Sequence, residues 1–296
     1  MSDRLPAASV LPGWFDPDLP PLHDDLSVRV VLPPSEENWQ AATYPGLEMR
    51  LLEYSSGAAP RVSVQLRLAA GTESASLGAS GDLELLVERG EIDCTAGADT
   101  DVWPARLYAR LPVERDEGAC TATLSLRAED DAAAEGRRGP DAALVYLATG
   151  HIAPSDTERR RIDTTDPSRW LPGPVVGTEV MPLHGHGTSN VMMIRWLGAI
   201  AFRPRLDPLG EEVLVVAGCL HDADGDYPAG TWIRNPVPAW QSWSGDPGTL
   251  VYYKSGHFAS APDEESVPAA TGSGGATAPG AGDADADADG AGADDA

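Results

Sequence analysis

His184 and His186 form the only His-x-His pair in this sequence, and this spacing can serve metal chemistry. Alternate residues of a β-strand point to one face, so such a pair can offer two imidazole nitrogens to one ion. Glycine at positions 185 and 187 predicts a surface turn instead. A metal site at His184 and His186, with His221 as a further ligand, is the alternative.

Other reactive groups are sparse. Three aspartates alternate along residues 222–226 as in part of a calcium loop, but no bidentate glutamate follows, and a polar turn around Gly225 accounts for them. Cys94, Cys120 and Cys219 lie far apart and predict reduced structural thiols. The sequence contains no Gly-x-Ser-x-Gly motif and no phosphate-binding glycine loop before a helix.

The 296-residue chain has 46 acidic and 21 basic side chains and a formal net charge of -25. Such a charge repels nucleic acid and anionic lipid surfaces, so neither is an expected partner. No apolar run approaches the ~20 residues of a membrane span, and residues 1–19 lack the apolar core of a secretory signal. We therefore expect a cytoplasmic protein that does not bind nucleic acid or membranes.

Residues 259–296 contain no aromatic and no basic side chain. Such a segment buries too little apolar surface to offset its ordering entropy, so we expect a disordered acidic tail. The tail is expected to act as a solubilising brush, with a docking arm for a basic partner as the alternative.

Comparison of the chain with itself reveals an internal duplication. Residues 39–52, 84–90, 108–113 and 144–152 match residues 170–183, 212–218, 232–237 and 250–258, in the same order. His151 and His257 are matched by the last pair of segments. Their equivalence predicts a structural role, such as capping the last strand of each repeat.

The matched segments are short, rich in Val, Leu and Ile, and bounded by Gly, Pro, Asp and Ser. Residues 62–68 alternate apolar and polar side chains as a half-buried strand does, and 190–197 and 211–220 are similar in length. We predict an all-β protein with two jelly-roll repeats. Its parts are an arm (1–38), repeat 1 (39–152), a linker (153–169), repeat 2 (170–258) and the acidic tail (259–296), with a polar insertion between 113 and 141.

Residues 210–218 (GEEVLVVAG) and 227–236 (YPAGTWIRNP) resemble the ChrR-like cupins, a group of the cupin superfamily named for the C-terminal domain of certain anti-sigma factors. With Gly256 and His257, the resemblance covers nearly all of 170–258. It implies a bicupin, the first repeat included through the duplication. The zinc-binding helical segment of those anti-sigma factors is not found, which argues against sigma-factor sequestration. Because cupins commonly dimerise through sheet edges, a homodimer is one expected state.

Cupins usually hold a metal with two alternate histidines, a following glutamate and a later histidine. Aligned on Gly218, that pattern falls on Arg205, Asp207, Glu211 and Gln241. A fixed guanidinium charge and no imidazole suit Fe, Zn or Mn poorly, so we expect no cofactor there. Asp207, Glu211 and Gln241 could form a weak Ca or Mg site instead. In the first repeat the pattern falls on a set that offers no site: Leu77, Ala79, Leu83 and Glu117.

The resemblance leaves two uses for these side chains. Arg205, Asp207 and Glu211 are expected to form a buried ion network in the space of the metal, or Arg205 presents its guanidinium to an anion that enters the barrel. Trp240 and Trp243 are expected in the core, or else as the lining of a pocket for a planar ligand, together with Trp232 on the preceding strand.

Three functions follow as hypotheses. The leading one is a sensor or accessory protein that binds a small organic molecule, an anion included, at Arg205, Asp207, Glu211, Gln241, Trp240 and Trp243. The second is a cupin-type dioxygenase or ketone-cleaving enzyme that holds Fe, Zn or Mn through unusual ligands. The third is a structural or partner-binding scaffold that acts through its tail.

Overall fold

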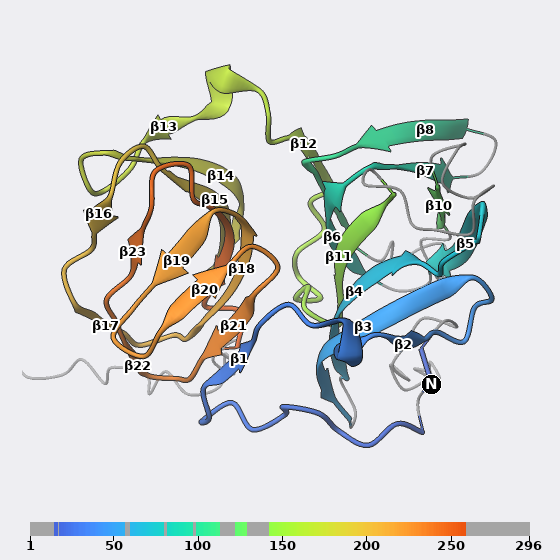
Figure 1. The fold of residues 1–296 in the computed structure, drawn as a ribbon, viewed down its shortest axis with the longest axis horizontal. Helices are drawn as coiled ribbons and strands as arrows, with labels where there is room; N and C mark the ends of the chain where they lie inside the picture. The colour runs from blue at the N-terminus through green and yellow to red at the C-terminus, as the bar shows by residue number, and fades with distance from the viewer. Residues whose placement is uncertain are drawn as a thin grey trace, which may run out of the picture. The chain divides into compact units, whose positions relative to one another are not determined.

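The computed structural model describes residues 15–16, 18–56, 60–79, 82–96, 99–112, 122–128 and 142–258. Figure 1 shows that strands dominate these residues, which confirms the predicted all-β class. The helical segments are the 3-10 turns η1 (Glu36–Asn38) and η2 (Pro167–Arg169). No helix in the described ranges is long and apolar enough to cross a membrane. The predicted acidic tail, most of the predicted insertion, Glu117 and Cys120 lie outside these ranges.

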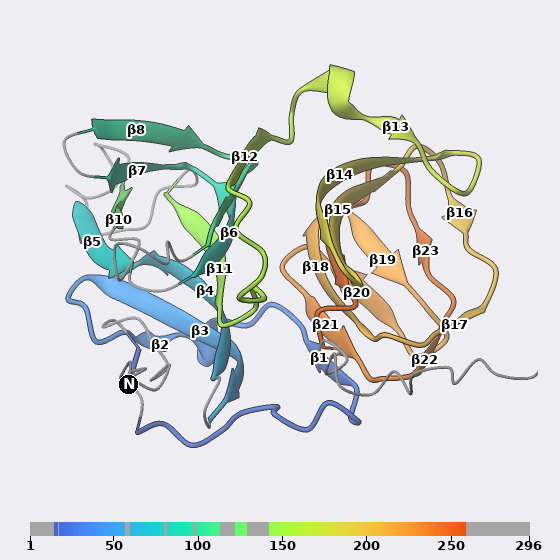
Figure 2. The same cartoon turned by 180° about the vertical axis from the view of Figure 1, so that it is seen from behind.

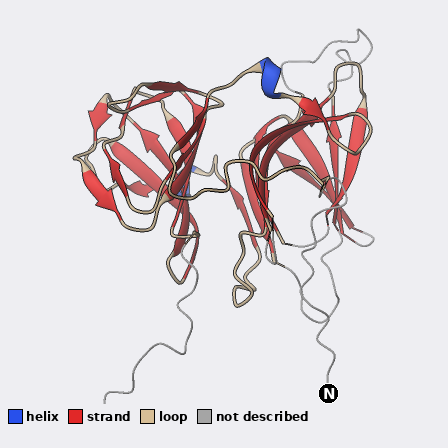
Figure 3. Cartoon of the chain, turned by 90° about the horizontal axis from the view of Figure 1, so that it is seen from below, coloured by secondary structure: helices blue, strands red, loops and turns tan. Residues whose placement is uncertain are grey.

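The first repeat contains a seven-stranded sheet, in the order β12-β9-β6-β11-β4-β3-β2, and a four-stranded sheet, in the order β5-β10-β7-β8. Figure 3 shows the two sheets as the layers of one barrel-like unit. The strands are β2 (Gln40–Ala41), β3 (Leu47–Ser55), β4 (Arg61–Leu68), β5 (Ser74–Ala79), β6 (Leu83–Arg89), β7 (Glu91–Ala96), β8 (Asp99–Pro104), β9 (Leu107–Leu111), β10 (Ala122–Arg127), β11 (Leu144–Thr149) and β12 (Arg160–Asp163).

The second repeat has the same plan. Its seven-stranded sheet has the order β1-β21-β18-β24-β15-β14-β13, its four-stranded sheet has the order β16-β23-β19-β20, and β17 pairs with β22 alone. The strands are β1 (Val30–Leu32), β13 (Leu171–Pro172), β14 (Thr178–His186), β15 (Ser189–Trp196), β16 (Ile200–Ala201), β17 (Arg205–Asp207), β18 (Glu211–Ala217), β19 (Cys219–His221), β20 (Asp226–Pro228), β21 (Trp232–Asn235), β22 (Ala239–Gln241), β23 (Ser244–Gly245) and β24 (Leu250–Ser255).

Each repeat receives an edge strand from the segment that precedes the other repeat. Strand β1 of the arm pairs with β21 of the second repeat, and β12 of the linker pairs with β9 of the first repeat. Figure 2 shows β1 beside β21. The arm and the linker therefore exchange strands between the repeats and fasten them together.

Hydrophobic side chains form a core in each repeat and a third core between the repeats. Along β18, Val213 and Val215 join the core of the second repeat, whereas Leu214 points to the core between the repeats. This alternation follows from the two-residue period of a strand. Because both faces of β18 are buried, its sequence reads as a continuous apolar run rather than an alternating one.

The core between the repeats also contains charged side chains at matched positions. Glu84 of β6 accepts a hydrogen bond from Tyr108 Oη at 2.6 Å. Its counterpart Glu212 of β18 accepts one from Trp232 Nε1 at 2.6 Å and another, across the interface, from Tyr146 Oη at 2.6 Å. These carboxylates are buried but hydrogen-bonded, as burial of charge requires. Polar contacts therefore join the repeats as well as apolar packing.

Candidate functional site

The predicted cupin positions of the second repeat lie near one another at one end of the barrel. Strand β17 pairs with β22, so that Arg205 lies opposite Gln241 and Asp207 lies opposite Ala239. Tyr253 of β24 connects the set, since its Oη donates to Asp207 Oδ2 at 3.4 Å and accepts from Arg205 Nη2 at 3.2 Å.

Arg205 does not occupy the interior of the barrel. Its side chain is 55% exposed, and its Nη2 is 3.7 Å from Asp207 Oδ2. The expectation of a guanidinium buried in the place of the metal is therefore wrong. The physical reason is the short two-stranded pairing of β17 with β22, which is hydrogen-bonded to neither larger sheet of the repeat.

Glu211 is the buried acid of this set. Its Oε1 accepts hydrogen bonds from Asn235 Nδ2 at 2.6 Å and Trp243 Nε1 at 2.9 Å. Burial raises the pKa of the Glu211 carboxyl to about 7 despite these donors. One carboxylate oxygen of Glu211 is already engaged, and the predicted set contains no imidazole. The iron, zinc or manganese site of a cupin is therefore not matched by Arg205, Asp207, Glu211 and Gln241.

A cavity that Arg205 lines in the second repeat is too small for an organic ligand. The cavity lined by Trp243, Tyr253 and Arg205 measures about 20 Å³, which is of the order of one water molecule. Trp243 is buried and belongs to the core of the second repeat. This cavity therefore gives no support to the leading expectation of ligand binding inside the barrel, which stays a prediction.

We predict that Glu211→Gln stabilises the protein more at pH 8 than at pH 5. A carboxyl whose pKa rises from 4.5 unfolded to about 7 folded stays protonated in the fold while the unfolded chain ionises. The free energy of unfolding of the wild type therefore falls as the pH rises from 4.5 to 7. The decrease is up to about 3 kcal/mol. Urea unfolding of both proteins at pH 5 and pH 8 measures the difference. An equal gap at both pH values would show that Glu211 is ionised in the fold.

The tryptophans occupy three different environments. Trp240 is 73% exposed and lies opposite Leu206 on the β17–β22 pair, so the expectation that it lines a pocket or lies in the core is wrong. Trp232 is fully buried between the repeats. Among the described residues, Trp243 is the tryptophan that hydrogen-bonds a predicted site residue, because its Nε1 donates to Glu211 Oε1.

His184 and His186 lie in a strand rather than a turn, because β14 continues to His186 through a bulge after Pro182. His184 is buried, and its Nε2 donates to Asp156 Oδ2 at 2.7 Å. His221 instead contacts Asp226, with 2.7 Å between Nδ1 and Oδ1. The predicted surface turn is wrong, and the alternative metal site with His221 is not assembled.

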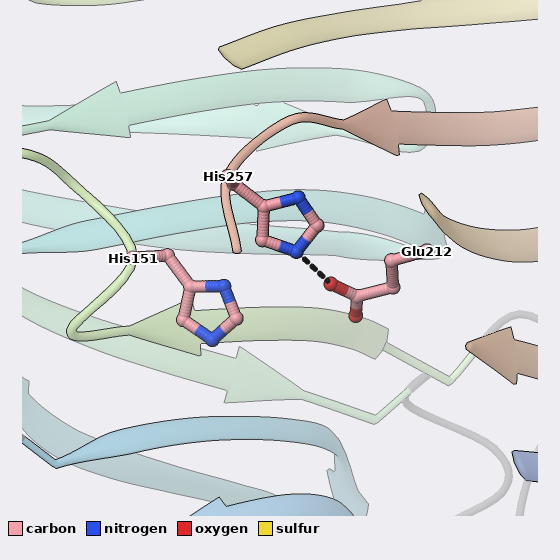
Figure 4. Close-up of side chains that lie close together, drawn as sticks. All are labelled: His151, Glu212 and His257. Carbon is pink, nitrogen blue, oxygen red and sulfur yellow. Dashed lines mark ion pairs between the residues drawn. The ribbon is translucent and has the colours of Figure 1, made fainter. Parts of the chain in front are cut away.

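Three other metal-binding side chains do come together between the repeats. His151 follows β11, His257 follows β24, and Glu212 belongs to β18; a donor atom of each lies within 4.8 Å of the others (Figure 4). The two imidazole rings stack with their centroids 5.5 Å apart. Sequence analysis matched the two histidines to each other but could not show that their repeats place them face to face.

A larger cavity, which we call the arginine cleft, lies between the arm, the first repeat and the second repeat. Its volume is about 350 Å³. Four arginines and two glutamates line it, an excess of positive charge in a chain whose net charge is -25. The charged and aromatic lining residues are Arg50, Arg67, Arg89, Arg106, Glu36, Glu88 and Trp39.

A chain of buried polar side chains forms the floor of the arginine cleft. Arg50 Nη1 donates to Gln65 Oε1 at 2.8 Å, and Gln65 Nε2 donates to Glu88 Oε1 at 2.7 Å. The remaining contacts of Arg50 are carbonyl oxygens, among them Gly230 O of the second repeat at 2.8 Å and Leu32 O of the arm at 2.7 Å. Burial raises the pKa of Glu88 to about 7.

Arg106 and Arg67 form other parts of the lining. Arg106 Nη1 is buried and has no hydrogen-bond partner, and its residue adopts a left-handed backbone with φ of 71°. Such strain in a residue other than glycine is typical of functional sites. Arg67 stacks on Trp39 at 3.9 Å from the ring centroid, and its Nη2 donates to Glu36 Oε2 at 2.7 Å. Arg106 therefore offers a free donor, whereas Arg67 is already paired.

The polar floor residues of the first repeat have apolar counterparts at the matched positions of the second repeat. Arg50 and Gln65 are cross-strand partners on β3 and β4, and the equivalent partners on β14 and β15 are Met181 and Met193. Glu88 is matched by Val216. The sequence comparison contained this signal, a charged residue in one repeat against an apolar residue in the other, but it did not single out these arginines.

Comparison with solved structures finds proteins of the same fold. The protein Ylba from E. coli matches with a TM-score of 0.56 and 12% identity over 78% of this chain and 92% of that chain. The bacterial pirin YhhW from E. coli, in complex with nickel(II), matches with a TM-score of 0.51 and 9% identity over 77% and 98%. HEPD from Streptomyces albus, with 2-hydroxyethylphosphonate and Fe(II) bound, matches with a TM-score of 0.50 and 11% identity over 80% and 78%.

These likenesses and the two strand-exchanged repeats define the fold as a cupin fold. Residues 157–259 match the family described as the ChrR Cupin-like domain, so the second repeat is a ChrR-like cupin domain, as its motifs predicted. The search of curated proteins found no match.

Proposed function

We propose that this cupin binds a small organic carboxylate in the arginine cleft and acts as a sensor or accessory protein in the cytoplasm. The observation that carries the proposal is the buried chain Arg50–Gln65–Glu88, with Arg106 beside it, at positions where the second repeat has apolar residues. Burial of charge lowers stability unless the charge is fully paired. The presence of this buried polar chain in one repeat alone is therefore better explained by ligand binding than by a contribution to folding.

The chemistry of the cleft favours a carboxylate. The guanidinium of Arg106 has a buried, unpartnered nitrogen, and a guanidinium matches the two oxygens of a carboxylate. Below pH 7, the protonated carboxyl of Glu88 can donate a further hydrogen bond to a bound anion. A volume of about 350 Å³ falls in the range of small-molecule sites.

We predict that a carboxylic acid will stabilise the wild-type protein and leave Arg106→Met unaffected. The test is thermal unfolding at pH 7 with mono-, di- and tricarboxylates, and with inorganic phosphate and sulfate as separate arms. At 100 times its dissociation constant a ligand adds about 2.7 kcal/mol, which raises the Tm by about 5 °C or more. The control is Arg195→Met, since Arg195 pairs with Glu179 at the surface and lines no part of this cleft.

Two outcomes would overturn this proposal. One is that no carboxylate stabilises the wild-type protein, or that stabilisation is equal in Arg106→Met. The other is that only phosphate or sulfate stabilises it, which would assign the cleft to inorganic anions. Arg195→Met must bind as the wild type does, because loss of binding in both variants would indicate a general effect of charge.

A further inference from the structure

We propose that His151, Glu212 and His257 bind one divalent transition ion, with zinc preferred, between the two repeats. None of these residues lines the arginine cleft or belongs to the positions that cupins use inside a barrel, so this site is independent of the proposed function. Two imidazoles and a carboxylate are a ligand set that zinc accepts, with a fourth position left for water.

The strongest observation is the contact between His257 and Glu212. His257 Nε2 and Glu212 Oε2 are 3.3 Å apart, both side chains are buried, and neither atom has a hydrogen-bond partner (Figure 4). Two atoms that bind zinc at about 2.0–2.1 Å with a tetrahedral angle lie about 3.3 Å apart. The pair therefore has the spacing of two ligands without the geometry of a hydrogen bond.

The surroundings hold the carboxylate in place for such a role. Glu212 Oε1 accepts from Tyr146 Oη and from Trp232 Nε1, each at 2.6 Å, which leaves Oε2 directed to His257. Partners of this kind orient metal-binding side chains and strengthen binding.

His151 completes the set from the first repeat. A ring nitrogen of His151 lies within 4.8 Å of the ligand atoms of Glu212 and His257. The His151 ring therefore has to move toward these two residues to bind the same ion. Its present contacts are weak, because Nε2 is 3.4 Å from Ser63 Oγ and Nδ1 is 3.3 Å from Lys254 Nζ.

The ammonium of Lys254 opposes binding of a cation at this site. The ammonium is buried, pairs with Glu84 and lies beside His151, so it repels a second cation in this space. The matched residue in the first repeat is Ala148. Removal of the ammonium in Lys254→Met should therefore tighten zinc binding by at least about tenfold.

The test uses full-length protein produced in zinc-supplemented medium and freed of loosely bound metal. We expect one zinc per chain by elemental analysis, and a tetrahedral absorption spectrum after cobalt substitution. His257→Gln and His151→Gln should lose both signals. His221→Gln is the matched control, because His221 contacts aspartates elsewhere and should leave both signals unchanged. Competition with a chelator measures the gain in Lys254→Met.

Absence of zinc and cobalt from both the wild type and Lys254→Met would overturn the inference, as would full binding by a folded His257→Gln variant. Circular dichroism and thermal unfolding show whether His257→Gln folds. If it does not fold, the cobalt absorption spectrum of His151→Gln tests the inference in its place. Arg106→Met should retain zinc, so failure of carboxylate binding and failure of zinc binding are distinguishable.

Discussion

Replacement of Arg234 by methionine is expected to lower the free energy of unfolding by about 3–5 kcal/mol. Arg234 is buried, and its Nη1 donates to Glu53 Oε2 of the first repeat at 2.7 Å. The guanidinium also donates to backbone carbonyls of the arm at His23, Asp25 and Val28. Its loss leaves the buried Glu53 with too little compensating charge and releases the arm from the second repeat. Urea unfolding measures the effect.

The matched control for this prediction is Arg195→Met. Its partner Glu179 lies 2.5 Å away, but both side chains are partly exposed, so we expect a cost below about 1 kcal/mol. A double variant, Arg234→Met with Glu53→Leu, should recover part of the loss because the unpaired carboxylate is also removed. Equal costs for Arg234→Met and Arg195→Met would contradict the role of Arg234 as a fastener between arm and repeats.

Gly256→Ala is the second substitution with a large expected effect, at about 4 kcal/mol. A Cβ at Gly256 would lie 2.0 Å from the carbonyl oxygen of Thr188, and its φ of +73° disfavours any residue with a side chain. Left-handed backbone costs about 1–2 kcal/mol, and a forced backbone shift adds about 1–3 kcal/mol. Gly150, its counterpart in the first repeat, has the same close approach to Pro60 O and should behave alike.

Thermal and urea unfolding of Gly256→Ala, Gly150→Ala and Gly187→Ala test this prediction together. Gly187 has a φ of +56°, but a Cβ there would meet nothing within 4 Å, so alanine should cost only about 1 kcal/mol. Similar costs at all three glycines would show that backbone conformation matters and the close approach does not.

Much of the fold could be predicted because it depends on patterns local in sequence. Strand β18 follows from the apolar run that ends at Gly218, and the duplication was visible in four matched segments. The strand exchange could not be predicted. Residues 30–32 show no pattern that distinguishes pairing with the second repeat from pairing with the first, because hydrogen-bond partners 200 residues apart leave no local signal.

The candidate site was less predictable for the same reason. Aligning the cupin pattern on Gly218 placed Asp207, Glu211 and Gln241 in one region, but it could not reveal that the Arg205 side chain is 55% exposed or that the cavity it lines holds no more than a water. The arginine cleft combines the arm with both repeats. The sequence carried a signal for it in the contrasts of Arg50 with Met181 and of Glu88 with Val216 at matched positions. These contrasts point to a site only when the burial of Arg50 and Glu88 is known.

Buried polar groups are concentrated at the junction of the two repeats. The interiors of both barrels are filled mainly by apolar side chains, whereas the charged and imidazole groups gather between the repeats and beside the arm. A duplicated fold permits this arrangement, because one repeat can keep its apolar core while its partner changes at the equivalent positions. Binding at the junction of the repeats is the consequence that we propose.

A crystal structure of the protein with its most stabilising carboxylate is the most direct test of this account. We predict that the ligand lies in the arginine cleft with its carboxylate on Arg106, and that the side chains of the second barrel stay in place. Ligand density beside Glu211 and Trp243, inside the second barrel, would contradict the account and return the binding site to the usual cupin position.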